Sequence, residues 1–265
     1  MRAEEALRRI AGERPLVHHL TNYVTANLVA NTTLSAGALP VMAHAPEEVE
    51  EMIGLASALV VNIGTLDSHF VEAALRAGGR ANERGIPVVL DPVGAGATTL
   101  RTQSAGRLLS ELEISAVCGN AGEIATIAGL YAEVRGVESL TGDAEAAVRK
   151  AAGSFGTTVA ATGETDYVSD GGQVLAVSNG HPLMGRVVGS GCASTAVVGS
   201  FAAVGGADVE TVAHALACFG RAGEVAAGGS GGGGTFEPCL LDALAALAAD
   251  PDGLGGTLRV REATG

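Results

Sequence analysis

A cysteine follows two closely spaced glycines in VVGSGCAS, residues 187–194, directly before a run typical of a helix. Glycines at a helix start let backbone N–H groups converge on an anion, and the helix dipole adds partial positive charge. Gly189 and Gly191 are therefore candidates for holding a phosphate, although a tight turn into a buried helix explains the same pattern. The stretch is not a Walker A loop, because that motif requires GK[ST] and the only lysine is Lys150.

Cys192 can be interpreted as a packing residue, as a nucleophile or as a stand-in for another residue type. At a helix N-terminus the pKa of a thiol is expected to fall, which favours a nucleophile. A cysteine nucleophile also needs a neighbouring base, and His181 lies eleven residues earlier, across a predicted strand.

Polar side chains follow several apolar runs. Asp91 ends the run IPVVLD and could bind a metal ion or cap the next loop, while Glu123 is placed to bind a metal or to complement a helix dipole. Thr162 could donate to a phosphate oxygen or belong to a turn. Asn22 could cap a helix, and Met42 is by default a core residue.

The elements that position these residues alternate along the chain. Apolar runs flanked by amphipathic stretches predict a parallel sheet covered by helices on both faces. The ligand site of such a sheet lies at the carboxyl ends of its strands, so the polar endings predict a cleft there. Strands are predicted over 16–20, 39–43, 58–64, 86–94, 114–120 and 157–163, and helices over 23–36, 46–57, 67–84, 101–111, 120–129 and 141–155.

The alternation stops at residues 164–187, where two β-prone pieces around DGG predict a hairpin. Helices are then predicted over 191–204, 208–227 and 238–249. The glycine-rich segment 228–234 is predicted to be a flexible loop, with close approach to a ligand as the alternative. No long linker divides the chain, so residues 1–265 are predicted to form one domain.

Charge and composition exclude several classes of protein. The net charge of −13 is unfavourable for a nucleic-acid partner, which needs clustered lysine and arginine. No run of about 18 apolar residues predicts a membrane span. The charged start, MRAEEALRRIAGERP, is helical in pattern and lacks a signal-peptide core, and the four cysteines form no CxxC pair. We therefore expect a cytoplasmic protein with no membrane partner and no disulfides.

Five segments together resemble the hydroxyethylthiazole kinase family, in the ribokinase-like superfamily. They are TNYVTANLVANTTLSAGALPVMAHAPEEV, VVNIGTL, GIPVVLDPVGAGAT, GNAGEIATIAG and VVGSGCASTAVVGSFAAV, in the same order as in the family. The resemblance implies a mostly parallel sheet flanked by helices and a homotrimer with active sites between subunits. It also implies ATP, Mg²⁺ and the alcohol 4-methyl-5-(2-hydroxyethyl)thiazole, whose hydroxyl attacks the γ-phosphate.

The resemblance also assigns roles to individual residues. The catalytic residue would be Cys192, at a position where the wider superfamily commonly has an aspartate base. The thiazole would contact Met42, Gly189 and Asn22, and Mg²⁺ would lie near Asp91 and Glu123. ATP would contact Thr162, Gly191, the position of Cys118 and, as a candidate for the positive field, Arg186.

One position departs from the family pattern. The residue before GN is usually an arginine that meets an ATP phosphate, and here it is Cys118. A thiol cannot replace a charge-assisted bond from arginine. Another arginine could reach the phosphate, ATP could bind more weakly, or the donor could differ. A kinase of another small heterocyclic alcohol and a ligand-binding sensor without turnover are the alternative functions.

Overall fold

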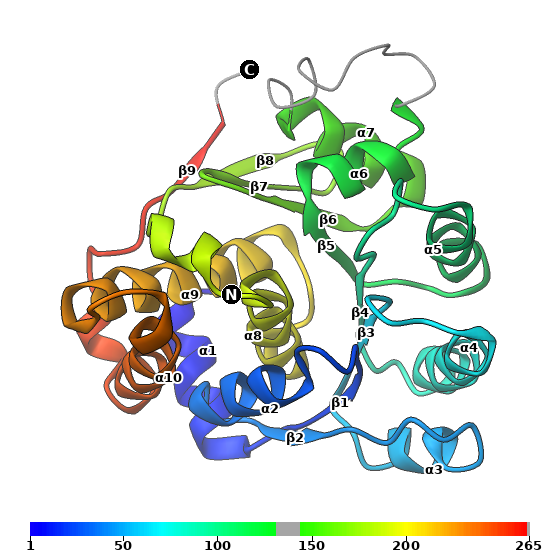
Figure 1. Ribbon diagram of the computed structural model, residues 1–265, viewed down its shortest axis with the longest axis horizontal. Coiled ribbons are helices and arrows are strands. Elements are labelled where there is room, and N and C mark those ends of the chain that lie inside the picture. Colours follow the sequence, from blue (N-terminus) through cyan, green and yellow to red (C-terminus); the bar gives the residue numbers. More distant parts are fainter. Residues whose placement is uncertain (131–143, 264–265) are drawn as a thin grey trace.

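The computed structural model describes residues 1–130 and 144–263. Within them the chain forms one sheet in the order β2-β1-β3-β4-β5-β6-β7-β8-β9 (Figure 1). Neighbouring strands from β2 to β6 pair parallel, whereas β6–β7, β7–β8 and β8–β9 pair antiparallel. The strands are β1 Leu16–Leu20, β2 Leu39–Val41, β3 Ala58–Asn62, β4 Val88–Asp91, β5 Ala116–Asn120, β6 Thr158–Thr162, β7 Asp166–Ser169, β8 Val174–Val177 and β9 Val260–Glu262.

Helices cover both faces of this sheet, as the apolar strands predict. One face carries α3 to α7 and the other carries α1, α2, α8, α9 and α10 (Figure 1). The predicted α/β fold is therefore confirmed. The helices are α1 Ala3–Glu13, α2 Ala26–Ser35, α3 Val49–Ile53, α4 Ser68–Glu83, α5 Thr99–Glu111, α6 Ala121–Ile127, α7 Ala144–Phe155, α8 Ser190–Gly205, α9 Val209–Gly229 and α10 Gly233–Ala249, with 3₁₀ helices η3 Pro182–Arg186 and η4 Pro251–Leu254.

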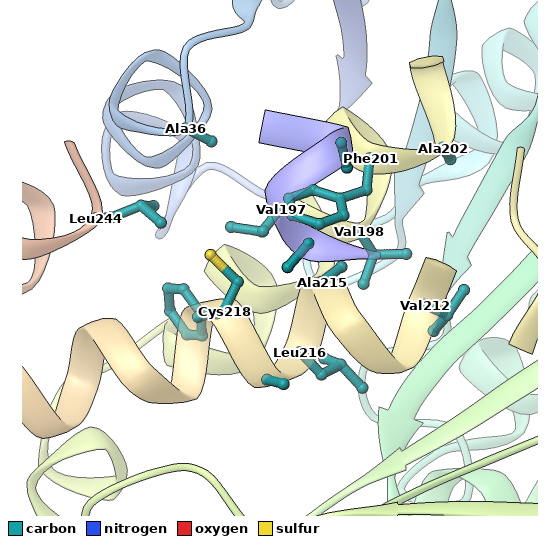
Figure 2. Close-up of a cluster of buried hydrophobic side chains, with 14 of the residues drawn as sticks. Ala36, Val197, Val198, Phe201, Ala202, Val212, Ala215, Leu216, Cys218 and Leu244 are labelled. Carbon is teal, nitrogen blue, oxygen red and sulfur yellow. The ribbon is translucent and has the colours of Figure 1, made fainter. Parts of the chain in front are cut away.

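Helix α8 is the central helix of its layer. Its buried residues include Val197, Val198 and Phe201, which gather with Leu216 and Cys218 of α9 in one apolar cluster (Figure 2). The helix also lies close to the sheet at Gly199, where a Cβ atom would come within 2.4 Å of Val60 Cγ2. With α8 packed in this way, its first turn, which holds Cys192, lies near the carboxyl ends of β3 and β4.

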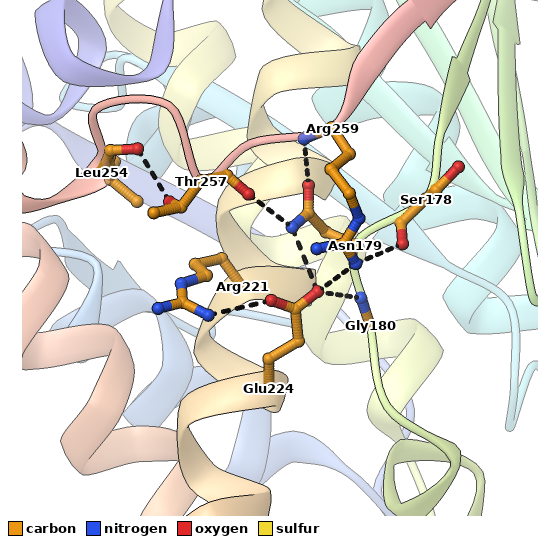
Figure 3. A network of polar contacts seen from close by, with 8 residues as sticks. All are labelled: Ser178, Asn179, Gly180, Arg221, Glu224, Leu254, Thr257 and Arg259. Carbon is orange, nitrogen blue, oxygen red and sulfur yellow. Dashed lines mark hydrogen bonds and ion pairs between the residues drawn. The ribbon is translucent and has the colours of Figure 1, made fainter.

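A polar network fixes the segment that leads into α8. The carboxylate of Glu224 on α9 accepts hydrogen bonds from Gly180 N, Asn179 Nδ2 and Arg259 Nη2, and its other oxygen pairs with Arg221 (Figure 3). The backbone N–H of Arg259 donates to Asn179 Oδ1 at 2.6 Å. The turn after β8 is thereby tied both to α9 and to the segment before β9.

The last third of the chain differs most from the sequence prediction. The hairpin is confirmed as β7 and β8, but β9 was not predicted because VRE is short and lacks a periodic pattern. The loop predicted over 228–234 is largely wrong, since α9 extends to Gly229 and α10 begins at Gly233. Pro238 lies inside α10 and does not start it. Residues 141–143 of a predicted helix lie outside the described residues.

Candidate active site

Three polar residues come together at the carboxyl ends of β1, β3 and β4. Asn22 and Asp91 are predicted site residues, and Asn62 is a further one that the structure adds. Asn62 and Asp91 end β3 and β4 and are register partners in the parallel pair. Asn22 follows β1, and its Oδ1 accepts a hydrogen bond from Thr25 N at 3.0 Å, which shapes the turn into α2. The first turn of α8 closes the group with Cys192. The structure thus brings a defined set of polar groups together at this edge of the sheet.

Asn62 connects the other members of the group. Its Nδ2 donates to Asp91 Oδ2 at 2.7 Å and to Cys192 Sγ at 3.2 Å. Its Oδ1 accepts from Asn22 Nδ2 at 3.0 Å and from Gly64 N at 3.0 Å. Asn22 Nδ2 also lies 3.4 Å from Cys192 Sγ. The sulfur atom therefore faces two amide donors. Such donors favour a negatively charged group at position 192 over a neutral one.

The thiol of Cys192 is nevertheless not a preformed thiolate. Burial raises its pKa above the ordinary value, and the negative charge of Asp91 raises it further. The lowered pKa expected for a nucleophile at a helix N-terminus is wrong, because desolvation and a nearby carboxylate outweigh the helix dipole. His181 does not serve as a base for it, since its side chain caps η3 by accepting a hydrogen bond from Leu183 N.

Asp91 is buried, with only 4% of its surface exposed. Its Oδ2 accepts from Asn62 and, at 3.2 Å, from Thr195 Oγ1 of α8. Burial raises the pKa of Asp91 to about 8, and the charge of Glu123 contributes to this shift. The ionised form of Asp91 is therefore destabilised in the fold, and either a bound proton or a nearby cation would relieve this.

Glu123 is a helix-capping residue in addition to any other role. Its Oε2 accepts from Asn120 N at 2.8 Å while Asn120 Oδ1 accepts from Glu123 N, which forms a capping box at the start of α6. Its Oε1 accepts from Gly94 N at 2.7 Å and so holds the loop after β4. The interpretation of Glu123 as a first-turn helix residue is confirmed.

Asp91 and Glu123 fit a magnesium ion that is also bound by phosphate and water better than a metal ion held by protein ligands alone. Mg²⁺ is usually held by one or two carboxylates together with phosphates and water. Asp91 and Glu123 are close enough for the charge of Glu123 to raise the pKa of Asp91, and a cation would relieve that repulsion. Among the described residues no group of three or more His, Cys, Asp or Glu could hold a metal ion. The donor set therefore fits Mg²⁺ completed by phosphate and water.

The first turn of α8 is open to an anion. Gly189 is its N-cap, has a left-handed φ of 91° and provides no side-chain cap. A Cβ atom at this position would come within 2.4 Å of Thr25 Cγ2, so a larger residue would push α8 away from the start of α2. First-turn amides have no intrahelical acceptor. Gly191 is exposed, which leaves the backbone beside Cys192 accessible.

The other residues assigned to ATP lie at separate points of the same sheet edge or beyond it. Thr162 ends β6, where its hydroxyl donates to Gly119 O at 3.2 Å. Arg186 is exposed at the end of η3. Cys118 is only 1% exposed and belongs to the apolar core, and burial strongly raises its pKa. Contacts of these residues with ATP stay predictions.

Arg101 is a site residue that the sequence did not reveal. From α5 its guanidinium donates to Gly64 O at 2.7 Å, to Val93 O at 2.9 Å and to Ile63 O at 3.0 Å. It therefore ties the loop after β3 to the loop after β4, directly beside Asn62 and Asp91. This role could not be predicted from residue types, because the acceptors are backbone carbonyls of two distant segments.

We expect Arg101→Gln to lower the free energy of unfolding by about 1–3 kcal/mol, because partly buried carbonyls lose charge-assisted donors. Arg107→Gln on the same helix is the matched control, since Arg107 is exposed and forms an ion pair with Glu111. Urea unfolding of both variants measures the difference. Equal losses in the two variants would show that Arg101 is an ordinary surface residue of α5.

Comparison with known proteins agrees with this geometry. The sequence model of the hydroxyethylthiazole kinase family matches residues 7–250. The hydroxyethylthiazole kinase of Rubrobacter xylanophilus is 73% identical over 264 residues, which cover 99% of each chain. The structure of the hydroxyethylthiazole kinase protein from Pyrococcus horikoshii superposes with a TM-score of 0.91 at 44% identity, covering 99% of both chains.

A more distant structure defines the wider class. A ribokinase-like superfamily protein from Enterococcus faecalis superposes with a TM-score of 0.65 at 14% identity, covering 93% of this chain and 94% of the other. The chain therefore has the α/β fold of a ribokinase-like protein. Within this class, the chain belongs to the hydroxyethylthiazole kinase family.

Proposed function

We propose that the protein transfers the γ-phosphate of ATP to the hydroxyl of 4-methyl-5-(2-hydroxyethyl)thiazole, a reaction of thiamine biosynthesis and salvage. The observation that carries this proposal is the group formed by Asn22, Asn62, Asp91 and Cys192 at the open first turn of α8, in a chain of this family. Asn22, Met42 and Gly189 would line the thiazole pocket.

The nucleotide would lie along the same edge of the sheet. Gly191 would offer backbone N–H groups to a phosphate, and Thr162 and Arg186 would contact ATP, as would the segment at Cys118. Asp91 and Glu123 would hold Mg²⁺, which when bound neutralises charge on the phosphate oxygens. These assignments rest on the family pattern and on the positions of the side chains at the strand ends.

The residues around Cys192 would act mainly by position. Phosphoryl transfer requires alignment and charge stabilisation and little covalent chemistry from the protein. Asn22 and Asn62 hold the sulfur atom with amide donors at 3.4 and 3.2 Å. Cys192 would take the proton of the substrate hydroxyl at Sγ when it is in the thiolate form. The two amides would stabilise the negative charge of that thiolate before the transfer, which leaves a neutral thiol.

Steady-state assays of ADP release test the proposed function. The protein is mixed with ATP, Mg²⁺ and a panel of heterocyclic alcohols that includes the thiazole alcohol. We expect the highest kcat/KM for the thiazole alcohol. Preference for another alcohol would support the related-kinase alternative, and binding without ADP release would support a sensor.

The cytoplasmic location stays a prediction; in the described part of the chain no helix is long and apolar enough to cross a membrane.

We further propose a homotrimer whose sites lie between subunits, as the family resemblance implies. Tyr23, Val24 and Val188 are apolar side chains with 72%, 70% and 76% of their surfaces exposed. They belong to two segments that approach each other where Gly189 faces Thr25. We infer that they make up one apolar patch beside the proposed thiazole pocket, which is unfavourable in water and suits a covered interface.

We expect sedimentation to show a trimer for the parent and smaller species for Val188→Asp, because a carboxylate would be desolvated at the interface. Leu55→Asp is the matched control, since Leu55 is 70% exposed at the end of α3, away from the patch. The control should remain trimeric. A monomeric parent at micromolar concentration would contradict the proposed assembly.

A further inference from the structure

Two histidines hold the segment that follows β2. His44 Nδ1 lies 3.2 Å from the carbonyl oxygen of Met42, and His18 Nε2 lies 2.7 Å from that of Ala43. His44 Nε2 also lies 3.1 Å from both N and O of Thr21, at the end of β1. Two consecutive carbonyls of one short segment thus face two imidazole rings.

The geometry selects one tautomer of His44. Thr21 N–H can only donate, so Nε2 must accept from it, and a neutral ring then carries its proton on Nδ1. That proton is aimed at Met42 O, which can only accept. The opposite tautomer could donate from Nε2 to Thr21 O, but it would set a lone pair of Nδ1 against Met42 O and leave Thr21 N–H without an acceptor, so it makes one hydrogen bond where the first tautomer makes two. No other hydrogen bond of Thr21 N–H occurs in the described residues.

His18 has the opposite tautomer for the same reason. Its Nε2 must carry a proton to donate to Ala43 O at 2.7 Å. The ring is fully buried on β1, and burial lowers its pKa, which keeps it neutral. The bond from His18 to Ala43 O therefore joins the middle of β1 to the segment after β2.

We propose that His18 and His44 form a two-histidine clamp that fixes the Met42–His44 segment relative to the end of β1 and thereby sets the affinity for the alcohol substrate. This inference rests on the proposed function, in which Met42 lines the thiazole pocket. Thr21, to which His44 binds, directly precedes Asn22, whose amide reaches Cys192 Sγ. The clamp therefore sets the distance between the pocket wall and the phosphoryl-transfer site.

The surroundings of His44 support a positioning role. Its ring centroid lies 6.2 Å from that of Tyr23 and 6.4 Å from that of Phe70, and both pairs are tilted. Phe70 is buried on α4, so the His44 ring has a buried aromatic neighbour. Met42 is a flexible residue that adapts to many shapes. Order in this wall of the pocket must therefore come from its backbone, which the clamp holds.

His44→Phe tests the clamp because it keeps an aromatic ring and removes both nitrogens. We expect KM for the thiazole alcohol to rise about tenfold through the lost hydrogen bonds, while kcat and KM for ATP change less than about twofold. His44→Gln, whose amide oxygen can accept from Thr21 N–H, should recover part of the loss. His69→Phe, at an exposed histidine of α4, is the matched control and should leave all three constants unchanged.

Histidine nitrogen NMR of the full-length unmutated protein gives a readout independent of activity. We expect an Nδ1-protonated ring for His44 and an Nε2-protonated ring for His18, with signals assigned from the variants that lack them. Nε2-protonated His44 would overturn the clamp, and so would an unchanged thiazole KM in folded His44→Phe. The clamp would also be overturned if kcat fell, and KM for ATP rose, by the same factor as KM for the thiazole alcohol. If the parent releases no ADP with the thiazole alcohol, the proposed function fails, while the tautomers still report on the clamp.

Discussion

Replacing Asp91 with asparagine is expected to stabilise the fold near pH 8 and to remove most of the kinase activity. Burial and the charge of Glu123 raise the pKa of Asp91 from 3.8 to about 8. Between these two values the folded state binds more protons than the unfolded state. Stability contributed by the protonated side chain is therefore complete at low pH and is lost as the pH rises toward 8. Asparagine removes this loss because it has no charge to desolvate.

The stability arm of this prediction is measured by urea unfolding without magnesium. We expect Asp91→Asn to exceed the parent by several kcal/mol near pH 8 and to match it near pH 4, because the pKa shift from 3.8 to about 8 corresponds to about 1.4 kcal/mol for each pKa unit. Burial also raises the pKa of Asp166 to about 7, but this group is present in both proteins and cancels. Asp242→Asn, at an exposed position of α10, should behave as the parent.

The activity arm should move in the opposite direction. Asparagine can still accept from Asn62 and Thr195, so the site should keep its shape while losing the charge proposed to hold Mg²⁺. We expect kcat/KM to fall at least about 100-fold. Added Mg²⁺ with ATP should raise the melting temperature of the parent more than that of the variant. A variant that is active, or that is less stable than the parent near pH 8, would show that Asp91 is a structural hydrogen-bond acceptor only.

The sequence predicted the parallel strands of this fold better than its last strand, β9. The strand over 16–20 is confirmed residue for residue, and the other five predicted parallel strands are found shorter, most of all the one over 86–94, which is β4 at Val88–Asp91. These runs are apolar on both faces, which is a strong local signal. β9 has no such signal, and its pairing with β8 depends on Glu224, whose bonds to Asn179 and Arg259 join segments about 80 residues apart.

The candidate site was predicted only where a strand ending marks it. Asp91 was found because it ends an apolar run, and Asn62 lies in the quoted segment VVNIGTL but was not singled out. Thr195 was not found, since its bond to Asp91 Oδ2 joins residues 104 positions apart. Arg101 was missed because its acceptors are carbonyls, which leave no trace in residue types.

Position 118 shows a different limit. The motif match identified Cys118 as the residue that replaces a phosphate-binding arginine, but strand alternation alone did not say on which side the thiol lies. The structure places it in the core beside α8 and α9. Asp91 and Asp166 are near enough for their charges to raise its pKa further, so a residue at this position lies just beneath the acidic part of the site.

The second large effect is expected at Cys192, interpreted as a stand-in for a carboxylate base. Cys192→Ala should lose about 10²–10⁴ in kcat, the usual contribution of a general base, with a smaller change in KM for ATP. Cys192→Asp should keep substantial activity, because Asn22 and Asn62 aim amide N–H groups at this position and a carboxylate accepts both. Cys239→Ala, at a half-exposed cysteine of α10, is the control and should match the parent.

The pH dependence separates a base from a positioning group. Burial and Asp91 raise the pKa of the Cys192 thiol above its ordinary value of 9.0, and only the thiolate can accept a proton. The kcat of the parent should therefore rise with pH up to and beyond 9, whereas Cys192→Asp should reach its plateau at lower pH. A covalent nucleophile predicts otherwise: intact mass spectrometry with ATP would trap a phosphocysteine, and the aspartate variant would be folded but inactive. Because the structure gives Cys192 two hydrogen-bond donors and no histidine base within its group, we expect no such adduct.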